Sequence, residues 1–283
     1  MNIACNDGDR EELSATYRAV PPAELSLTAV RGFPLVRAGD DLAQLLLSRL
    51  EAASAAPGAA AAPALRDDDV LVFAQKIVSK AEGRCVRLAD VVPSQRARAL
   101  AAQVAKDPRL VELVLSESRR IVRAARDVLI VEHRLGFVLA NAGIDQSNVA
   151  SAQEGESALL LPLDPDASAE RLRARLAAHS GCRLGVIISD SFGRPWRVGT
   201  VGVAIGVAGW AAVTDLRGRA DLFGRTLRVT VVGHADEIAA AASLLMGQAG
   251  EGQPVVRVRG LALPPAGSDG KALLRPASED LFR

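Results

Sequence analysis

The residues best suited to chemistry lie in residues 184–210. This segment opens with an apolar, β-rich run at 184–188, which is typical of a strand buried on both faces. Asp190 follows between two serines, where we expect the strand to end, and Arg194 and Arg197 come a few positions later. A carboxylate at the end of a buried strand lies where functional groups often lie in α/β proteins. An ordinary turn capped by aspartate would explain the same residues.

A second polar cluster lies at residues 141–149. It follows another apolar segment and brings Asp145, Ser147 and Asn148 close together in the chain. Loops rich in Asp, Asn and Ser are often only turns. Two such loops, each with a carboxylate at the end of a strand, are harder to explain as turns alone.

Two lysines follow the strand predicted at residues 70–73. Lys76 and Lys80 lie there beside Gln75. A lysine just beyond a strand can bind anionic oxygen, whereas a lysine on a solvated face is the more frequent case. Both interpretations stay open from these residues alone.

Several frequent catalytic motifs are absent. The chain contains no GxxxxGK[ST], HExxH or GxSxG, and no GxGxxG with the spacing of a dinucleotide site. Oxygen ligands remain, namely Asp145 and Asp190 with Gln248 or Glu251, and these suit a hard cation such as magnesium or manganese. Such ions usually bridge phosphate oxygens while lysines and arginines neutralise the remaining charge. The residues therefore indicate metal-assisted phosphoryl transfer.

Apolar strands and amphipathic helices must position these groups, and their order predicts an α/β protein. We expect strands at residues 25–30, 70–73, 128–132, 136–140, 159–163, 184–188, 226–232 and 254–258. We expect helices from Gly39 onward, over most of 93–126, over 164–181 with Ser168 as N-cap, and over 235–246. Residues 52–64, rich in Ala, Pro and Gly, are typical of a surface loop. The glycines after the central strand allow a ligand or another chain to approach the backbone closely: Gly199, Gly202, Gly206 and Gly209.

The composition argues against several classes of protein. A formal net charge of +1 over 283 residues gives no overall attraction to nucleic acid or to an anionic membrane. The three cysteines have no CxxC spacing, which argues against a disulfide framework or a thiolate zinc site and fits a reducing cytosol. No apolar run approaches the roughly 20 residues that span a bilayer, and the N-terminus is too polar for a signal peptide. We expect a soluble, cytoplasmic protein with neither a nucleic-acid nor a membrane partner.

Five separated segments resemble the coenzyme F420-0:L-glutamate ligases, or gamma-glutamyl ligases. They read GFPLVRAGDDL, VFAQKIVSKAEGR, RLGFVLANAGIDQSNV, VIISDSFGRPWRVGTVGVAIGVAG and MGQAGEGQPVVRVRG, in the order and spacing of that family. The resemblance covers roughly residues 30–260 and is to the single-module form, without the C-terminal flavin-binding domain of actinobacterial relatives. It implies an α/β fold with mixed sheets, in a two-domain protomer that pairs as an intertwined homodimer.

The polar N-terminus predicts a disordered leader over 1–24, and the Pro/Gly-rich end predicts a frayed tail over 263–283. The resemblance implies a catalytic module of two interleaved subdomains over 25–262, and it also implies a reaction. In the family's reaction, GTP phosphorylates the terminal carboxylate of F420-0, and the amine of L-glutamate displaces phosphate from the acyl phosphate to form an amide. Further γ-linked glutamates can follow. Two alternatives stay open: a ligase of the same fold for another carboxylate, and a non-catalytic GTP-binding relative.

The resemblance also implies which residues bind the metal ion and GTP, at the positions that match the family's motifs. The divalent cation, Mg²⁺ or Mn²⁺, is expected on Asp145, Asp190, Ser191 and Gln248, and K⁺ is a further expected activator. GTP contacts are expected from Phe33, Pro34, Leu35, Val36, Gln75, Lys80, Asn148, Gly247, Gln248, Gly250 and Gly252. Gln75 stands where some relatives have serine, so its contact is the least secure. Asp190 is expected to be catalytic, and from their charge and position Arg194 and Arg197 are expected to clamp phosphate or the substrate carboxylate.

Overall fold

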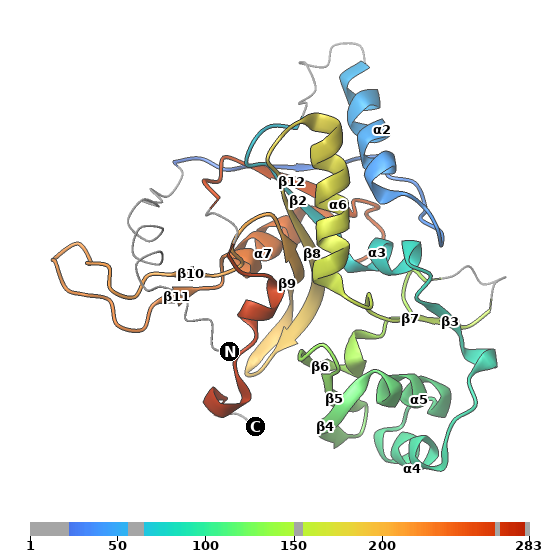
Figure 1. The fold of residues 1–283 in the computed structure, drawn as a ribbon. Helices are drawn as coiled ribbons and strands as arrows, with labels where there is room; N and C mark the ends of the chain where they lie inside the picture. The colour runs from blue at the N-terminus through green and yellow to red at the C-terminus, as the bar shows by residue number, and fades with distance from the viewer. Residues whose placement is uncertain (1–22, 56–64, 150–154, 264–266, 281–283) are drawn as a thin grey trace, which may run out of the picture.

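The computed structural model describes residues 23–55, 65–149, 155–263 and 267–280. Among these residues the largest sheet has five strands, in the order β1–β12–β2–β8–β9 (Figure 1). Their bounds are Ser26–Ala29, Val255–Arg259, Val70–Ala74, Gly185–Arg194 and Arg197–Ala208. Strands β2 and β8 run parallel, and the other neighbouring pairs are antiparallel. The expected α/β class with mixed sheets is therefore confirmed.

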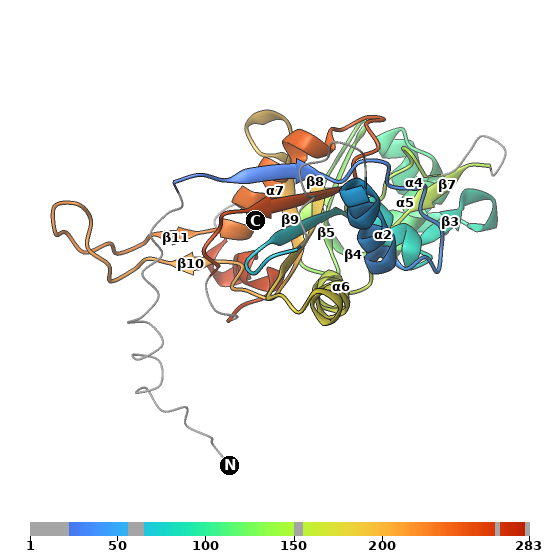
Figure 2. The same cartoon turned by 90° about the horizontal axis from the view of Figure 1, so that it is seen from above.

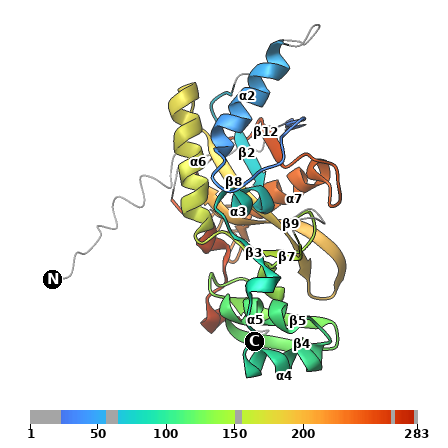
Figure 3. The same cartoon turned by 90° about the vertical axis from the view of Figure 1, so that its right-hand side faces the viewer.

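Helices cover both faces of this sheet (Figure 3). Helices α2 (Leu42–Ala55) and α6 (Pro165–Ser180) pack on one face, and α7 (His234–Met246) packs on the other. Strand β2 shows why both faces are apolar: Leu71 and Phe73 join the α2–α6 core, whereas Val70 and Val72 join the α7 core. All four side chains are fully buried, as the period of a strand between two helical layers requires.

Two glycines of β9 let these helices come close to the sheet. A Cβ at Gly206 would overlap the carbonyl group of Pro165 at the start of α6, and one at Gly202 would overlap that of Ala239 in α7. We expected a ligand or another chain to approach these glycines, but at these two positions the close neighbour is the backbone of the same chain.

A separate buried cluster forms the α4–β6 region, which lies below the sheet in Figure 1. This region comprises α4 (Gln95–Val104), α5 (Pro108–Ser116), β4 (Ser118–Ala125), β5 (Val128–His133) and β6 (Val138–Ala140). Its three strands form an antiparallel sheet in chain order. The short pair β3 (Cys85–Arg87) and β7 (Ser157–Leu159) leads into and out of it. Helix α3 (Gln75–Ala81) directly follows β2, and its Ile77 and Val78 belong to the α2–α6 core.

A long arm extends from the body beside the sheet (Figure 2). It is formed by β10 (Thr214–Asp215), β11 (Val231–Val232) and the chain between them. Leu222 and Phe223 in this arm are 99% and 90% exposed. No helix among the described residues is long and apolar enough to cross a membrane.

Most predicted elements are present, and several boundaries were wrong. The segment 93–126, predicted to be mostly helical, contains the two helices α4 and α5, and beyond Ser116 it forms the strand β4. Strand β8 continues past Ser189 to Arg194, so Asp190 lies within a hairpin arm and not on a loop. The N-cap of α6 is Asp164, whose side chain accepts a bond from the Ala167 amide, and not Ser168. The first four residues of the segment 52–64 are helical.

Two further expectations concern the C-terminal half. The strand predicted over 226–232 is reduced to the two residues of β11. The expected frayed tail contains η3 (Gly270–Leu273) and η4 (Ala277–Glu279), and the Gly270 amide donates a 2.9 Å bond to Asp166 Oδ1. The described part of the tail therefore packs on the body. The expected leader falls almost wholly on residues 1–22, outside the described residues.

Candidate active site

Three chain segments meet where the parallel pairing of β2 with β8 ends. Ala74 of β2 is in register with Ser189 of β8, so α3 and Asp190 follow from the same edge of the sheet. Asp145 reaches this edge because its backbone exchanges two hydrogen bonds with Leu159, of 2.8 and 3.1 Å. The edge where parallel strands end is the usual place for a site in a sheet of this kind.

Asp145 is held by a lysine and by its own loop. Lys76 Nζ lies 2.6 Å from Asp145 Oδ2, and the Ser147 amide donates a 2.7 Å bond to Asp145 Oδ1. Burial raises the pKa of Asp145, but the bonds from Lys76 and Ser147 outweigh burial and hold its pKa below the usual value. Asp145 is therefore a carboxylate at neutral pH.

Asp190 is half-buried and lies beside the same charges. Burial and the negative charge of Asp145 raise the pKa of Asp190 to about 6, although the Ser191 amide and Lys76 act in the opposite direction. The Ser191 amide donates a 2.8 Å bond to Asp190 Oδ1. Two carboxylates that disfavour each other's charge form a site that attracts a cation.

The glycine-rich loop after α7 closes on this cluster. Ser191 Oγ donates a 2.8 Å bond to Gln248 Oε1, and Asn148 Nδ2 donates a 3.0 Å bond to the Ala249 carbonyl. Lys80 Nζ donates a 2.6 Å bond to the Asn148 carbonyl. Glu251, the alternative oxygen ligand, accepts a 2.8 Å bond from the Ala249 amide within its own loop. Hydrogen bonds therefore tie the loop to both β8 and the Asp145 segment.

The oxygen atoms gathered here fit a hard divalent cation that keeps some non-protein ligands. Within the described residues no group of three or more His, Cys, Asp and Glu side chains could hold a metal. The set is two carboxylates, Asp145 and Asp190, supplemented by the neutral oxygens of Ser191 and Gln248. Mg²⁺ and Mn²⁺ suit few carboxylates together with phosphate and water oxygens, whereas zinc favours His and Cys.

Comparison with known proteins gives a consistent result. Residues 32–260 match the family model described as F420-0:Gamma-glutamyl ligase. The chain belongs to this family. It is 49% identical to "Coenzyme F420:L-glutamate ligase" of Methanothermobacter thermautotrophicus, over 92% of this chain and 99% of the relative. It is 47% identical to the protein of the same name from Archaeoglobus fulgidus, over 90% and 94%. The equivalent from Methanocaldococcus jannaschii is 44% identical, over 77% and 86%.

The structure brings together most of the residues that the resemblance to the gamma-glutamyl ligases indicated. Asp145, Asp190, Ser191, Gln248, Lys80 and Asn148 form the cluster described above, and the loop of Gly247, Gly250 and Gly252 borders it. The segment 33–36 lies before α2, and the chain after it bonds to the C-terminal end of α3 through the Gly39 amide and the Ala81 carbonyl, at 2.8 Å.

Three predicted residues lie apart or face elsewhere. Arg194 and Arg197 pair at the end of the β8–β9 hairpin, four and seven positions beyond Asp190 in the chain. At about 3.3 Å per strand residue, the backbone of Arg194 lies on the order of 13 Å from that of Asp190. Gln75 is 2% exposed, and its Nε2 donates a 2.6 Å bond to Ser79 Oγ. Its side chain packs inside the protein beside the cluster, with Oε1 unbonded.

Two residues that contact Asp145, Lys76 and Ser147, were absent from the site residues that the resemblance implied. Lys76 bonds to Asp145, and its Nζ also donates a 2.8 Å bond to Ser147 Oγ. The sequence contained a usable signal for Lys76, because residues four apart in a helix share a face and Lys80 was already assigned.

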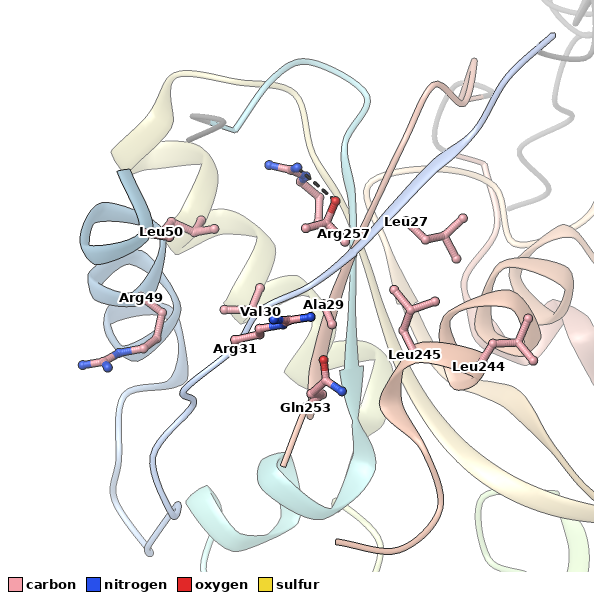
Figure 4. A pocket seen from close by; sticks show the side chains of 12 residues that line it. Leu27, Ala29, Val30, Arg31, Arg49, Leu50, Leu244, Leu245, Gln253 and Arg257 are labelled. Atoms are coloured by element: carbon pink, nitrogen blue, oxygen red, sulfur yellow. Dashed lines mark hydrogen bonds between the residues drawn. The ribbon is translucent and has the colours of Figure 1, made fainter. Parts of the chain in front are cut away.

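A separate cavity of about 670 Å³ runs along the outer edge of β1 (Figure 4). Leu50 of α2 and Leu244 of α7 line its apolar walls, and Arg31, Gln253 and Arg257 contribute polar groups. Gln253 directly follows the glycine-rich loop, so the cavity begins next to the cluster's loop. None of the predicted site residues lines it, and no sequence pattern indicated it.

Proposed function

We propose that this protein is a GTP-dependent ligase that joins L-glutamate to the terminal carboxylate of coenzyme F420-0 through an acyl phosphate. The observation that supports the proposal best is the pairing of Asp145 and Asp190, from distant segments, beside two lysines and a glycine-rich loop. The description of the family model supplies F420-0 as a substrate, and the names of the relatives supply L-glutamate.

The cluster contains oxygen atoms that could bind a divalent cation and positively charged or amide groups that could bind phosphate. Asp145, Asp190, Ser191 Oγ and Gln248 Oε1 would hold Mg²⁺ or Mn²⁺. That ion would supply neutralisation of phosphate oxygens. Lys80 and the backbone amides of the loop 247–252 would bind the nucleotide phosphates. K⁺ as an additional activator is part of the proposal.

The need for a good leaving group explains why the proposed reaction uses GTP. A carboxylate is a poor electrophile, because attack by an amine would have to expel oxide. In the proposed first step, an oxygen of the F420-0 carboxylate attacks the γ-phosphorus and GDP leaves. In the second, the unprotonated amine of glutamate attacks the acyl carbon and inorganic phosphate leaves. The protein's contribution is alignment and charge neutralisation, with Arg194 and Arg197 proposed to bind a phosphate or carboxylate.

The assembly is also part of the proposal. The separate buried cluster of the α4–β6 region supports a two-domain protomer. The exposed apolar residues of two projecting segments support a homodimer: Leu222, Phe223, Trp196 and Val198. A cytoplasmic location fits the reaction, since GTP and glutamate are intracellular substrates.

Mass spectrometry of one incubation tests the activity. The purified protein is mixed with F420-0, GTP, L-glutamate and Mn²⁺, and we expect mass gains of one or more glutamyl units. Omission of GTP or addition of a chelator should abolish the gain. GTP binding without any mass gain would contradict the proposal, and a screen of other carboxylates would then separate a sister ligase from a non-catalytic relative.

A further inference from the structure

Lys76 occupies a particular position among the charges of the cluster. Its Nζ lies 2.6 Å from Asp145 Oδ2 and donates a 2.8 Å bond to Ser147 Oγ. It also acts electrostatically on Asp190, where its charge opposes that of Asp145. One ammonium group thus serves two carboxylates.

The hydrogen bonds leave few oxygen atoms for a cation. Asp145 Oδ1 accepts from the Ser147 amide and Asp190 Oδ1 accepts from the Ser191 amide. The other oxygen of Asp145, Oδ2, is the atom that Lys76 contacts at 2.6 Å. A divalent ion bonded to Oδ2 lies about 2.1 Å from it, so the ion and the ammonium group would compete for the same oxygen.

We propose that Lys76 is an exchangeable counter-ion: it neutralises Asp145 until a divalent cation takes that oxygen, and its ammonium group then moves to a phosphate of the nucleotide. This inference rests on the proposed metal site at Asp145 and Asp190. It assigns Lys76 a positioning role that links cation binding to phosphate binding.

The mobility that this exchange requires is consistent with the surroundings of Lys76. Its side chain is 30% exposed, so the four-carbon stem has solvent on one side. Lys80, one helical turn further on, donates a 2.6 Å bond to the carbonyl of Asn148. A cation on Asp145 Oδ2 would therefore meet Lys76, whose ammonium group lies 2.6 Å from that oxygen.

The exchange has a measurable consequence for cation affinity. In wild-type protein, part of the free energy of Mn²⁺ binding is spent on breaking the Lys76–Asp145 ion pair. Lys76→Met removes this competitor and a positive charge, so Mn²⁺ should bind at least about tenfold more tightly, given the size of charge interactions at this range. Lys76→Arg keeps the charge and should bind Mn²⁺ like the wild type.

A titration of free Mn²⁺ followed by electron paramagnetic resonance tests this without any turnover. Lys106→Met, in the α4–α5 connection, has the same change in net charge and should leave the affinity unchanged. A second titration includes a non-hydrolysable GTP analogue, with its own Mn²⁺ binding subtracted. There the advantage of Lys76→Met should disappear, because the wild-type lysine gains a phosphate partner that the variant lacks.

The outcomes separate the inference from the function on which it rests. Equal or weaker Mn²⁺ binding by folded Lys76→Met would overturn the exchange while leaving the metal site in place. No Mn²⁺ binding by any of the four proteins, with or without the analogue, would overturn the metal site as well. Tighter binding by Lys76→Met alone, reversed by the analogue, supports the exchange.

Discussion

Asp190 takes part in a hydrogen bond and in a charge interaction, and one substitution can separate the two. Its Oδ1 accepts the Ser191 amide, and its charge is coupled to Asp145. Asparagine keeps the acceptor oxygen and the volume but removes the charge. Because a bound divalent ion supplies several kcal/mol, we expect Asp190→Asn to lower the rate of glutamate addition by about a hundredfold or more. Thermal unfolding should change little.

The control is Asp90→Asn, which makes the same chemical change in an exposed ion pair with Arg87. It should retain wild-type turnover. Near-normal turnover of folded Asp190→Asn would mean that the carboxylate only shapes the hairpin, and the proposed metal site would lose one of its two charges.

Glu117 is a buried carboxylate whose ionisation stabilises the fold. Arg84 and Arg134 each lie 3.0 Å from Glu117 Oε2, and His133 Nε2 lies 3.4 Å from it. Burial raises the pKa of Glu117, but its interactions with these three side chains outweigh burial and lower its pKa from 4.5 to about 2. The ionised form therefore stabilises the folded state above about pH 4.5, and this contribution is lost as the pH falls towards 2.

The size of this contribution is about 3 kcal/mol. We expect the free energy of unfolding in urea to fall steeply as the pH is lowered through this range. Glu117→Gln should be less stable at neutral pH and should show a shallower loss in acid, because it has no proton to gain. Glu51→Gln, on an exposed position of α2, should keep the wild-type slope. Equal slopes in Glu117→Gln and wild type would refute the assignment.

At the scale of elements, the hydrophobic pattern of the sequence predicted a helix or strand correctly where the tertiary contacts favoured the same element. The uninterrupted apolar runs predict β2 and the first half of β8, and the Ala-rich segment predicts α7. The pattern failed at 118–125, where a helical period continues past Ser116. Pairing of β4 with β5 overrides it, and the turn between them has Asp127 at a φ of 61°.

The second half of β8 shows why the hairpin was missed. Ser189, Asp190 and Gly193 are typical turn residues, yet the turn lies later, at Pro195 and Trp196, where Trp196 has a φ of 58°. Pairing with β9 keeps the polar residues extended. The cluster itself was recognisable by resemblance, but the contact of Lys76 with Asp145 depends on how distant segments meet, which residue types alone do not specify.

Gly206 sets the distance between α6 and the sheet. A methyl group there would overlap the Pro165 carbonyl, which is backbone and cannot rotate away. We expect Gly206→Ala to destabilise the protein by about 1–3 kcal/mol or more, as overpacking does. Gly193→Ala, where a Cβ meets open space, is the matched control and should not destabilise. Calorimetry measures both, and equal melting temperatures would contradict this packing.

At the scale of the whole molecule, the cluster contains residues from two parts of the chain, the large sheet with its helices and the segment that follows the α4–β6 region. Asp190 and Gln248 belong to the large sheet and its α7 loop, whereas Asp145 follows the α4–β6 region. Arg84 and Glu117 add an ion pair of 3.0 Å between the α3–β3 connection and the end of α5. A change in the relative position of the two parts would therefore separate Asp145 from Asp190. This coupling is a reason to expect the assembly to matter for activity.

The projecting β10–β11 arm supports the last prediction. Leu222 is 99% exposed and Phe223 is 90% exposed, and adjacent large apolar side chains at this exposure are unfavourable in a monomer. We expect the wild-type protein to sediment as a dimer at micromolar concentration, with the arm packed on a second copy. Leu222→Asp places a charge in that contact and should shift the protein towards monomer.

Val92→Asp is the control, because Val92 precedes α4, lies outside the arm and is 83% exposed. It should sediment like the wild type. A stable wild-type monomer would contradict the homodimer. A wild-type dimer that Leu222→Asp leaves intact would instead move the contact away from the arm, and the exposed Trp196 and Val198 at the end of the β8–β9 hairpin would be the next surface to change. Because Arg194 and Arg197 lie at that same end, loss of the dimer through the hairpin should also alter substrate affinity, which links assembly to the reaction.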